Sequence, residues 1–250
     1  MKIFLDIGNT FVKTASSRDN KLEDGLKVLT EKFVEQPKNY LQDSEPENTR
    51  IFISSVRGEI FDSALIKKIN DYGYLCNLIK VREEFCGFKT LYNPGSLGVD
   101  RWLACLAANY KYGHDIVVVD AGTAITVDIV SGNGLHLGGY ITAGLGELGN
   151  KINSSTNLKC EDISLIPLDS LPAQTDDALI SGNLIMMRGF FKQIEKIITN
   201  ARFGMALNND FKWVVTGGDC HLAGACLSVP FFTNPKLVLE GALIYSLYWD

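Results

Sequence analysis

The sequence predicts an α/β protein built from two similar halves. Its central stretch, Val117–Val130, repeats the chemistry of the opening stretch, Ile3–Thr14. In both stretches an apolar run ends in Asp-x-Gly, a small hydroxyl residue follows closely, and a second strand-like run comes next. Asp120 stands 114 positions after Asp6, a spacing typical of one small domain. Strand-like and helix-like segments then alternate in each half, which favours α/β architecture over other classes.

We expect the first domain to span residues 1–112. It opens with a hairpin of two short apolar runs joined by a Gly-Asn turn. Further on, the apolar residues of Gly58–Tyr72 recur with a helical period, and Gly98–Arg101 leads into another helix with Trp102 on its apolar face. The strands expected in this half are Lys2–Asp6, Phe11–Ala15, Leu26–Leu29, Ile51–Ser54 and Tyr74–Ile79, with a short helix at Asn39–Gln42.

The second domain is expected to span residues 113–250 and to begin with the same pattern. A long helical segment, Thr175–Thr199, contains two glycines that could interrupt it, and the chain ends in an amphipathic helix, Leu237–Trp249. The strands expected here are Ile116–Asp120, Ile125–Val130, Leu135–Ile141 and Trp213–Thr216.

The composition indicates a globular enzyme rather than a nucleic-acid-binding or membrane protein. Hydrophobic residues make up 46% of the chain, and the net charge of −5 implies no basic face for phosphate backbones. No apolar run approaches the ~18 residues of a membrane span, and the first residues do not resemble a signal peptide, so we expect the cytoplasm. The six cysteines form no C-x-x-C pair and are expected to be small buried hydrophobic residues, while the three histidines are scattered singly.

The two Asp-x-Gly turns together predict a polyphosphate site. A strand that ends in a carboxylate and turns on glycine brings backbone N–H groups and a metal-binding oxygen to one point. Either hairpin alone would fit an ordinary β-turn, in which Asp and Gly are common. Two matched hairpins together predict a cleft in which a magnesium-bound polyphosphate is bound by one turn from each side.

Several motifs carry a resemblance to a known family, the type III pantothenate kinases. The motifs are Asp6–Thr10, Gly98–Arg101, Asp120–Asp128, Gly138–Ile141, Thr175–Gly182, Thr216–Asp219 and Leu237–Gly241. The family belongs to the superfamily of acetate and sugar kinases, heat-shock chaperone ATPases and actin. The resemblance therefore implies two duplicated ribonuclease-H-like (actin-like ATPase) domains, with mixed sheets flanked by helices and the active-site cleft between them.

The resemblance also implies the reaction: ATP-dependent phosphorylation of pantothenate to 4′-phosphopantothenate, the first step of coenzyme A biosynthesis. Asp100 would be the general base, and Asp6 would hold magnesium through a water molecule. Asp120 would ligate a monovalent cation, potassium or ammonium. The residues implied for ATP are Asp6, Ile7, Gly8, Asn9, Thr10, Phe11, Val12, Lys13 and Thr123, with Gly217–Asp219 near the adenosine.

Pantothenate would be bound by Tyr92, Gly98, Val99, Asp100 and Arg101, and by Thr175 from the partner subunit of a homodimer. One departure from the family pattern concerns the tyrosine. Leu91 stands at the usual spacing ahead of Gly-x-Asp-Arg, and Tyr92 comes one position later. A second departure is Ala143-Gly144 where Pro-Gly is common, which should loosen that turn.

Three alternatives remain open from the residues. The chain could be a non-catalytic regulatory relative that binds nucleotide, or a kinase of the superfamily that acts on another small alcohol. A dinucleotide fingerprint, Gly144–Gly149 followed by Asp169, would suggest an oxidoreductase. However, the polar run Asn153–Asn157 would end any helix within about two turns, too early for that βαβ unit.

Overall fold

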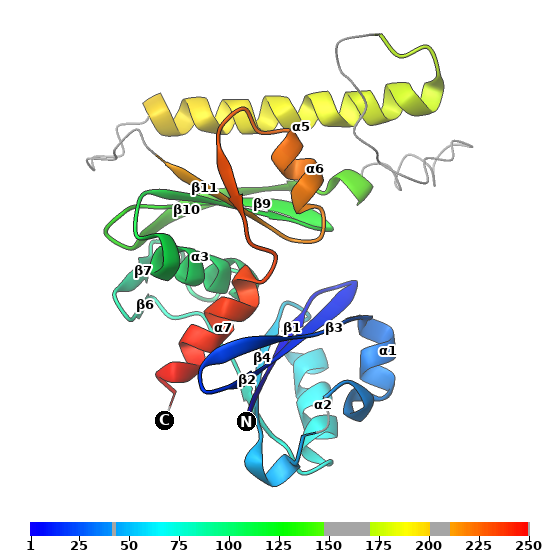
Figure 1. Ribbon diagram of the computed structural model, residues 1–250, viewed down its shortest axis with the longest axis vertical. Helices are drawn as coiled ribbons and strands as arrows, with labels where there is room; N and C mark the ends of the chain where they lie inside the picture. Colours follow the sequence, from blue (N-terminus) through cyan, green and yellow to red (C-terminus); the bar gives the residue numbers. More distant parts are fainter. Residues whose placement is uncertain (42–43, 148–170, 201–210, 250) are drawn as a thin grey trace. The chain divides into compact units, whose positions relative to one another are not determined.

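The computed structural model describes residues 1–41, 44–147, 171–200 and 211–249, and it divides into two units (Figure 1). The first unit consists of Met1–Lys111 with Lys236–Asp250, and the second of Tyr112–Pro235. The chain thus leaves the first unit after Lys111 and returns to it at Lys236. The last helix, α7 (Leu237–Leu247), packs against strands of the first unit.

The first unit contains a five-stranded mixed sheet in the order β3-β2-β1-β4-β5. The first three strands in the chain form an antiparallel meander, and the last two run parallel to β1. The strands are β1 (Lys2–Ile7), β2 (Phe11–Arg18), β3 (Lys21–Leu29), β4 (Arg50–Ser55) and β5 (Leu75–Leu78).

Alternation along β1 and β4 supplies both faces of this sheet with apolar side chains. Ile3, Leu5 and Ile7 enter a core with residues of α1 (Thr30–Glu35) and α2 (Glu59–Asn70). The intervening Phe4 and Phe52 stack at 5.7 Å between ring centroids. The helix α7 packs against β1, β2 and β4.

The remaining elements of the first unit include a short hairpin and a helix. Strands β6 (Glu84–Phe85) and β7 (Phe88–Thr90) pair antiparallel, and α3 (Val99–Tyr112) follows. Two short 3₁₀ helices, η1 (Pro37–Tyr40) and η2 (Pro46–Asn48), precede β4. Most of α3 is buried, including Trp102.

The second unit repeats the topology of the first. Its strands pair in the order β12-β11-β8-β9-β10, again an antiparallel meander followed by two strands parallel to the first. The strands are β8 (Ile116–Ala121), β9 (Ala124–Val130), β10 (Leu135–Ala143), β11 (Lys212–Thr216) and β12 (Phe231–Thr233). This repetition confirms the predicted duplicated α/β fold.

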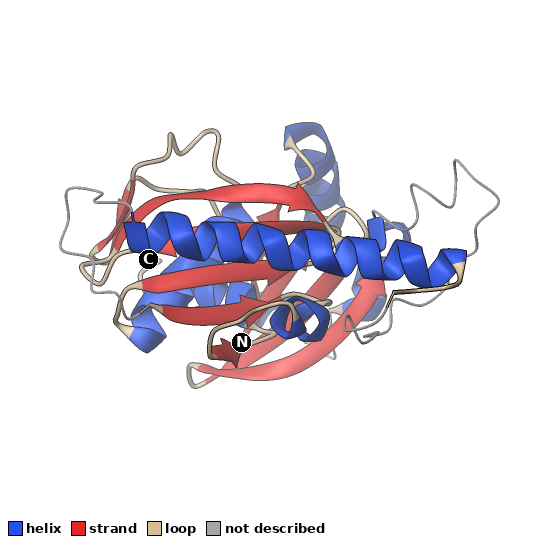
Figure 2. Ribbon diagram, turned by 90° about the horizontal axis from the view of Figure 1, so that it is seen from above, coloured by secondary structure: helices blue, strands red, loops and turns tan. Residues whose placement is uncertain are grey.

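The longest helix, α5 (Thr175–Asn200), covers the second sheet (Figure 2). Its buried side chains recur every three or four residues and join the core formed by β8, β9 and β11. The helix is continuous through Gly182 and Gly189, so the interruption considered from the sequence does not occur. The short α6 (Cys220–Ala225) follows β11 and completes this unit.

Candidate active site

The first Asp-x-Gly turn joins β1 to β2, as the sequence predicts. Asp6, at the carboxyl end of β1, pairs with Lys13 of β2 on one side and with Ser54 of β4 on the other. The turn is closed by a hydrogen bond from the Gly8 amide to the Phe11 carbonyl oxygen, 3.0 Å long. The structure thus brings Asp6 and the predicted nucleotide-binding residues 7–13 into one continuous hairpin end.

Asn9, Thr10 and Phe11 are exposed, whereas Ile7 and Val12 are buried in the core. The two buried side chains anchor the strand ends on either side of the exposed residues. Of the predicted ATP-binding residues, Ile7 and Val12 therefore support the hairpin through packing, and any contact with a ligand would involve their backbone.

The Gly98–Arg101 motif forms the N-terminal end of α3. The amide of Trp102 donates to the Gly98 carbonyl oxygen at 3.1 Å, which closes the first turn of the helix. The Asp100 carboxylate folds back and accepts a hydrogen bond of 2.8 Å from the Arg101 amide. A β-carbon on Gly98 would lie 2.5 Å from Asp100 Oδ1, so this carboxylate position requires glycine there.

Arg101 connects the motif to Tyr92. Its side chain is only 6% exposed, and its guanidinium lies over the Tyr92 ring, 5.2 Å from the centroid. Arg101 Nη2 also donates to the Tyr92 hydroxyl at 3.4 Å. Tyr92 therefore joins the Gly-x-Asp-Arg motif despite its one-residue offset, whereas Leu91, at the usual spacing, is exposed.

The second Asp-x-Gly turn, Asp120–Thr123, lies at the carboxyl end of β8. Asp120 pairs with Thr126 of β9 and with Thr216 of β11, which places two hydroxyl residues beside its position. The amide of Asp219 donates to the Ala121 carbonyl oxygen at 2.9 Å, and the amide of Gly144 donates to the Thr123 carbonyl oxygen at 2.9 Å. Two separate loops therefore hold this turn.

Both loops meet the turn through a glycine. Gly217 has φ = +94°, and a β-carbon there would overlap the Ala121 carbonyl oxygen and lie 2.5 Å from Asp120 Oδ1. A β-carbon on Gly144 would overlap the Gly122 carbonyl oxygen. Gly144 thus packs tightly against the turn.

Thr175, the residue predicted to reach a partner subunit, is the first residue of α5 and is exposed. The amide of Ala178 donates to the Gln174 carbonyl oxygen at 2.9 Å, so the helix begins at this point. Within the dinucleotide fingerprint considered above, Leu148 and Gly149, together with Asp169, lie outside the described residues, as does Asn153–Asn157.

Comparison with known proteins identifies the family. Residues 2–200 match the family model of the type III pantothenate kinases, and this range contains all three aspartates and Thr175. The chain belongs to the type III pantothenate kinase family. It is therefore an enzyme of the kinase class.

Relatives named type III pantothenate kinase agree with this membership. The protein from Pseudomonas aeruginosa strain LESB58 is 30% identical over 233 residues, which cover 89% of this chain and 90% of that protein. The protein from Marinomonas sp. strain MWYL1 is 37% identical over 150 residues, and that match covers 60% of this chain and 57% of that protein.

Solved structures show the same fold. A Campylobacter jejuni protein described as a conserved putative Baf family transcriptional activator aligns over 98% of both chains, with 26% identity and a TM-score of 0.60. A ROK family glucokinase from Streptomyces griseus, crystallised with glucose and AMPPNP, aligns over 98% of both chains at 11% identity and a TM-score of 0.52. The second likeness supports the actin-like kinase fold alone.

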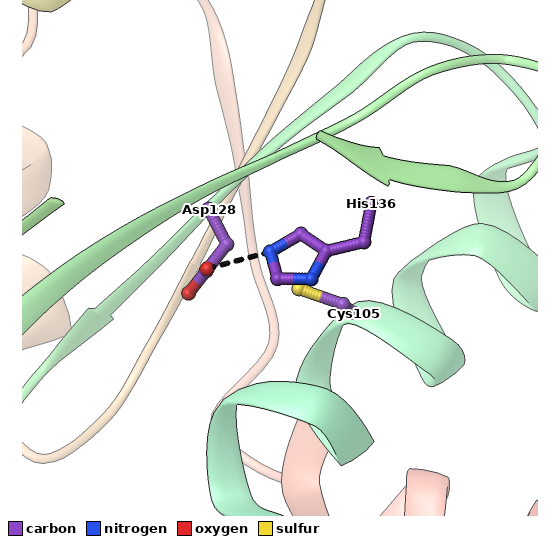
Figure 3. A group of neighbouring side chains, drawn as sticks. All are labelled: Cys105, Asp128 and His136. Atoms are coloured by element: carbon purple, nitrogen blue, oxygen red, sulfur yellow. Dashed lines mark hydrogen bonds and ion pairs between the residues drawn. The ribbon is translucent and has the colours of Figure 1, made fainter. Parts of the chain in front are cut away.

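One polar pair within this pantothenate kinase family member escaped the sequence analysis. His136 Nε2 lies 2.8 Å from Asp128 Oδ1, and both side chains are at most 1% exposed (Figure 3). They face each other across the β9–β10 hairpin, next to a register shift between His136 and Gly138. The histidines are scattered singly along the sequence, but His136 is not isolated in the fold, because its ring, Asp128 and Cys105 bring one possible ligand atom each within 4.8 Å of one another. The signal was present in the spacing of Asp128 and His136 on either side of the Ser131–Gly134 turn.

The cysteines also differ in part from expectation. Cys105, Cys220 and Cys226 are buried, but Cys86 is exposed, and Cys160 lies outside the described residues. Burial raises the pKa of the half-buried Cys76 to about 12, so its thiol is uncharged at neutral pH.

Among the described residues, no helix combines the length and hydrophobicity that a membrane crossing requires.

Proposed function

We propose that this chain transfers the γ-phosphoryl group of ATP to the primary hydroxyl of pantothenate, giving 4′-phosphopantothenate for coenzyme A biosynthesis. The observation that carries the proposal is the family match over residues 2–200, within which Asp6, Asp100, Arg101 and Asp120 are all present. We assign the reaction to the cytoplasm, where the free thiols of the chain stay reduced.

The hairpin end at residues 6–13 and Thr123 are assigned to ATP. Backbone amides and threonine hydroxyls donate to phosphate oxygens, and glycine lets the backbone approach closely. Asp6, at the carboxyl end of β1, suits magnesium held through water, because Mg²⁺ favours few carboxylates and keeps several waters. Magnesium would neutralise charge on the transferring phosphoryl group.

Asp120 is assigned to a monovalent cation, potassium or ammonium. The support is its position at a strand end beside Thr126 and Thr216, whose oxygens are hard ligands like those of a carboxylate. Such a cation would offset further phosphate charge. Gly217, whose missing side chain leaves room at Asp120, keeps that position open.

Asp100 is assigned as the general base for pantothenate. Its carboxylate takes the proton of the primary hydroxyl as the new P–O bond forms and the bond to ADP breaks. A carboxylate with a reference pKa near 4 is a weak base, but the proton leaves late in a loose transition state. General-base catalysis of this kind raises the reaction rate roughly 10²–10⁴-fold.

Tyr92 and Arg101 are assigned to the pantothenate carboxylate, alongside Gly98 and Val99. The guanidinium held by the Tyr92 ring is fixed in orientation, which favours two-point recognition of a carboxylate. Because Arg101 is nearly buried, a carboxylate that meets it is largely withdrawn from water, and their attraction is correspondingly stronger.

We propose a homodimer in which Thr175 completes the partner's pantothenate site. The support is a stripe along the exposed side of α5 made of small and apolar residues: Ala178, Gly182, Ile185, Met186 and Gly189. A β-carbon on Gly182 or Gly189 would meet nothing within 4 Å. Glycine in a helix interior costs about 1 kcal/mol relative to alanine, so two such positions suit close approach of another helix.

A coupled assay with ATP, magnesium, potassium and pantothenate tests the function. Turnover by the wild-type chain is expected, and Asp100→Asn should lower kcat by about 10²-fold or more with nearly unchanged ATP affinity. A folded wild-type chain without turnover rejects the proposal. Full activity of Asp100→Asn removes the base assignment but leaves the function standing.

A second candidate is a regulatory protein that binds nucleotide without catalysis. The name of the Campylobacter jejuni relative, a putative transcriptional activator, is the observation in its favour. ATP binding without phosphorylation of pantothenate or of any other small alcohol in a panel would support this candidate. Turnover of another alcohol alone would instead identify a different kinase activity.

A further inference from the structure

The turn at residues 8–10 is held from outside through all three of its carbonyl oxygens. Thr30 Oγ1 donates to the Gly8 oxygen at 3.1 Å, and the Thr30 amide donates to the Thr10 oxygen at 3.0 Å. The middle oxygen, that of Asn9, accepts from Arg57 Nη1 at 3.1 Å. The family motif contains the turn itself but neither of the residues that hold it.

These bonds determine where the amides of the turn point. A trans peptide is planar, and its C=O and N–H groups point in opposite directions. Arg57, by binding the Asn9 oxygen, therefore directs the Thr10 N–H away from its own side. A donor that binds the carbonyl also polarises the peptide, which makes the N–H on the other end a stronger donor.

Arg57 reaches the turn because the pairing of β4 with β1 continues past the end of the strand. The Val56 amide donates to the Ile7 oxygen at 3.3 Å, which brings the next residue beside the turn. The side chain is exposed, but its guanidinium lies 4.8 Å from the Phe61 ring centroid, and its own amide donates to Ser55 Oγ. These contacts limit its freedom.

We propose that Arg57 is a positioning residue for the phosphates of ATP. It holds the Asn9 carbonyl on one side so that the Thr10 amide is already directed at a phosphate oxygen before the nucleotide arrives. Thr30 does the same for the peptides on either side. Preorganised amides bind an anion without reorganisation, so the loss of Arg57 weakens nucleotide binding and leaves pantothenate recognition intact. This inference rests on the proposed function of the turn.

The test measures nucleotide binding without turnover. Titration calorimetry with Mg²⁺-AMPPNP is performed on the full chain and on Arg57→Ala, Arg57→Lys and Arg18→Ala. The loss of one charge-assisted hydrogen bond predicts about a tenfold weaker Kd for Arg57→Ala. Arg57→Lys retains one donor and should recover part of the affinity. Arg18, an exposed arginine at the far end of β2, is the matched control and should bind as wild type does.

Steady-state kinetics add a readout that a merely structural role would not move. In Arg57→Ala the KM for ATP should rise by the same factor, while the KM for pantothenate stays within twofold. Unchanged Mg²⁺-AMPPNP affinity in Arg57→Ala overturns the proposal, and so does an equal rise in both KM values.

A substitution that leaves the charge unchanged distinguishes an effect of turn orientation on nucleotide binding from an effect of charge. Thr30→Val removes the hydroxyl that holds Gly8 without altering any charge, and Thr30→Ser retains it. Weaker nucleotide binding in Thr30→Val than in Thr30→Ser supports orientation of the turn. Equal binding in the two overturns it. AMPPNP binding is measured without pantothenate, so it tests the role of Arg57 independently of turnover. If the chain binds nucleotide but does not phosphorylate pantothenate, the proposed function is rejected, and the Arg57 variants still test the positioning role.

Discussion

At the scale of single residues, two glycines of the second unit are needed for different reasons. Gly217 combines a positive φ of +94° with direct crowding by the Asp120–Ala121 backbone and carboxylate. Gly113 also has a positive φ, +58°, but nothing lies within 4 Å of the position of its missing β-carbon. A comparison of Gly217 with Gly113 therefore separates the effect of backbone strain from that of steric overlap.

We expect Gly217→Ala to lower the free energy of unfolding by roughly 2–4 kcal/mol, because strain and overpacking act together. Gly113→Ala should cost about 1–2 kcal/mol from strain alone. Urea denaturation followed by circular dichroism measures both. Equal losses in the two variants would contradict the packing of Gly217 against the Asp120 turn.

Gly217→Ala should also affect the cation requirement. A methyl group 2.5 Å from Asp120 Oδ1 must displace that carboxylate. We therefore expect the potassium concentration for half-maximal activity to rise several-fold in Gly217→Ala and to stay unchanged in Gly113→Ala. A potassium titration of kcat at saturating substrates measures this. An unaltered potassium dependence in a folded Gly217→Ala enzyme would argue against Asp120 as the cation ligand.

The motif residues were predictable because each is a short local signal, an acid and a glycine at a strand end or helix start. The residues that support these motifs were not predictable. Arg57 and Thr30 reach the first turn from 20 or more positions away, and only the folded chain brings them there. The contact between the Arg101 guanidinium and the Tyr92 ring was likewise not predictable from the spacing of the motif.

At the scale of elements, long periodic segments were predicted well and short ones were missed. Most strands of both meanders and the helices α2, α3, α5 and α7 carry enough residues to show a period, although β3 begins at Lys21 and not at the expected Leu26. The β6–β7 hairpin and β12 contain two or three residues per strand, too few for alternation to stand out. The helix α5 stays continuous because Ile180, Leu184 and Met187 bury one side of it around its first glycine.

The exposed side of α5 yields a prediction about assembly. Gly182→Glu places a carboxylate in the middle of the proposed helix–helix contact and should convert the dimer to a monomer. Loss of Thr175 from the partner's site should then raise the KM for pantothenate. Sedimentation velocity measures the mass. Ala64→Glu, which adds the same charge to an exposed position of α2, is the control and should stay dimeric. A Gly182→Glu chain with the wild-type mass would contradict the assignment of this stripe.

At the scale of the whole molecule, the sequence predicted the duplication but did not indicate where the last helix packs. In each half, five strands follow the same order and the same directions, which confirms that each half repeats one topology. The expectation of an amphipathic last helix is wrong, because α7 is apolar and buried on nearly all sides from Leu237 to Ser246. Such a pattern indicates a buried helix but not which sheet it covers. In the structure α7 packs on β1, β2 and β4, far away in sequence.

The position of α7 leads to a prediction about which piece of the chain folds alone. Residues 1–112 lack the helix that covers one face of their sheet. The side chains of Leu237, Leu239 and Tyr245 are at most 6% exposed, and each buried apolar side chain of this size contributes about 1.5–3 kcal/mol. Gly241 lies against the Leu103 carbonyl oxygen, where a β-carbon would overlap, so the helix seats closely on α3.

We therefore expect residues 1–112 to be unfolded or molten, and residues 1–111 joined by a flexible linker to residues 236–250 to fold cooperatively. A short linker suffices because Lys111 Nζ lies 3.1 Å from Glu240 Oε1, one helical turn from the start of the returning segment. Thermal unfolding and amide dispersion in NMR spectra distinguish the two polypeptides. Lys111→Ala in the joined chain should fold almost as well, because a partly exposed ion pair contributes at most ~1 kcal/mol. If residues 1–112 fold cooperatively on their own, α7 is dispensable to this unit, and the division of the chain lies closer to the one that its sequence predicts.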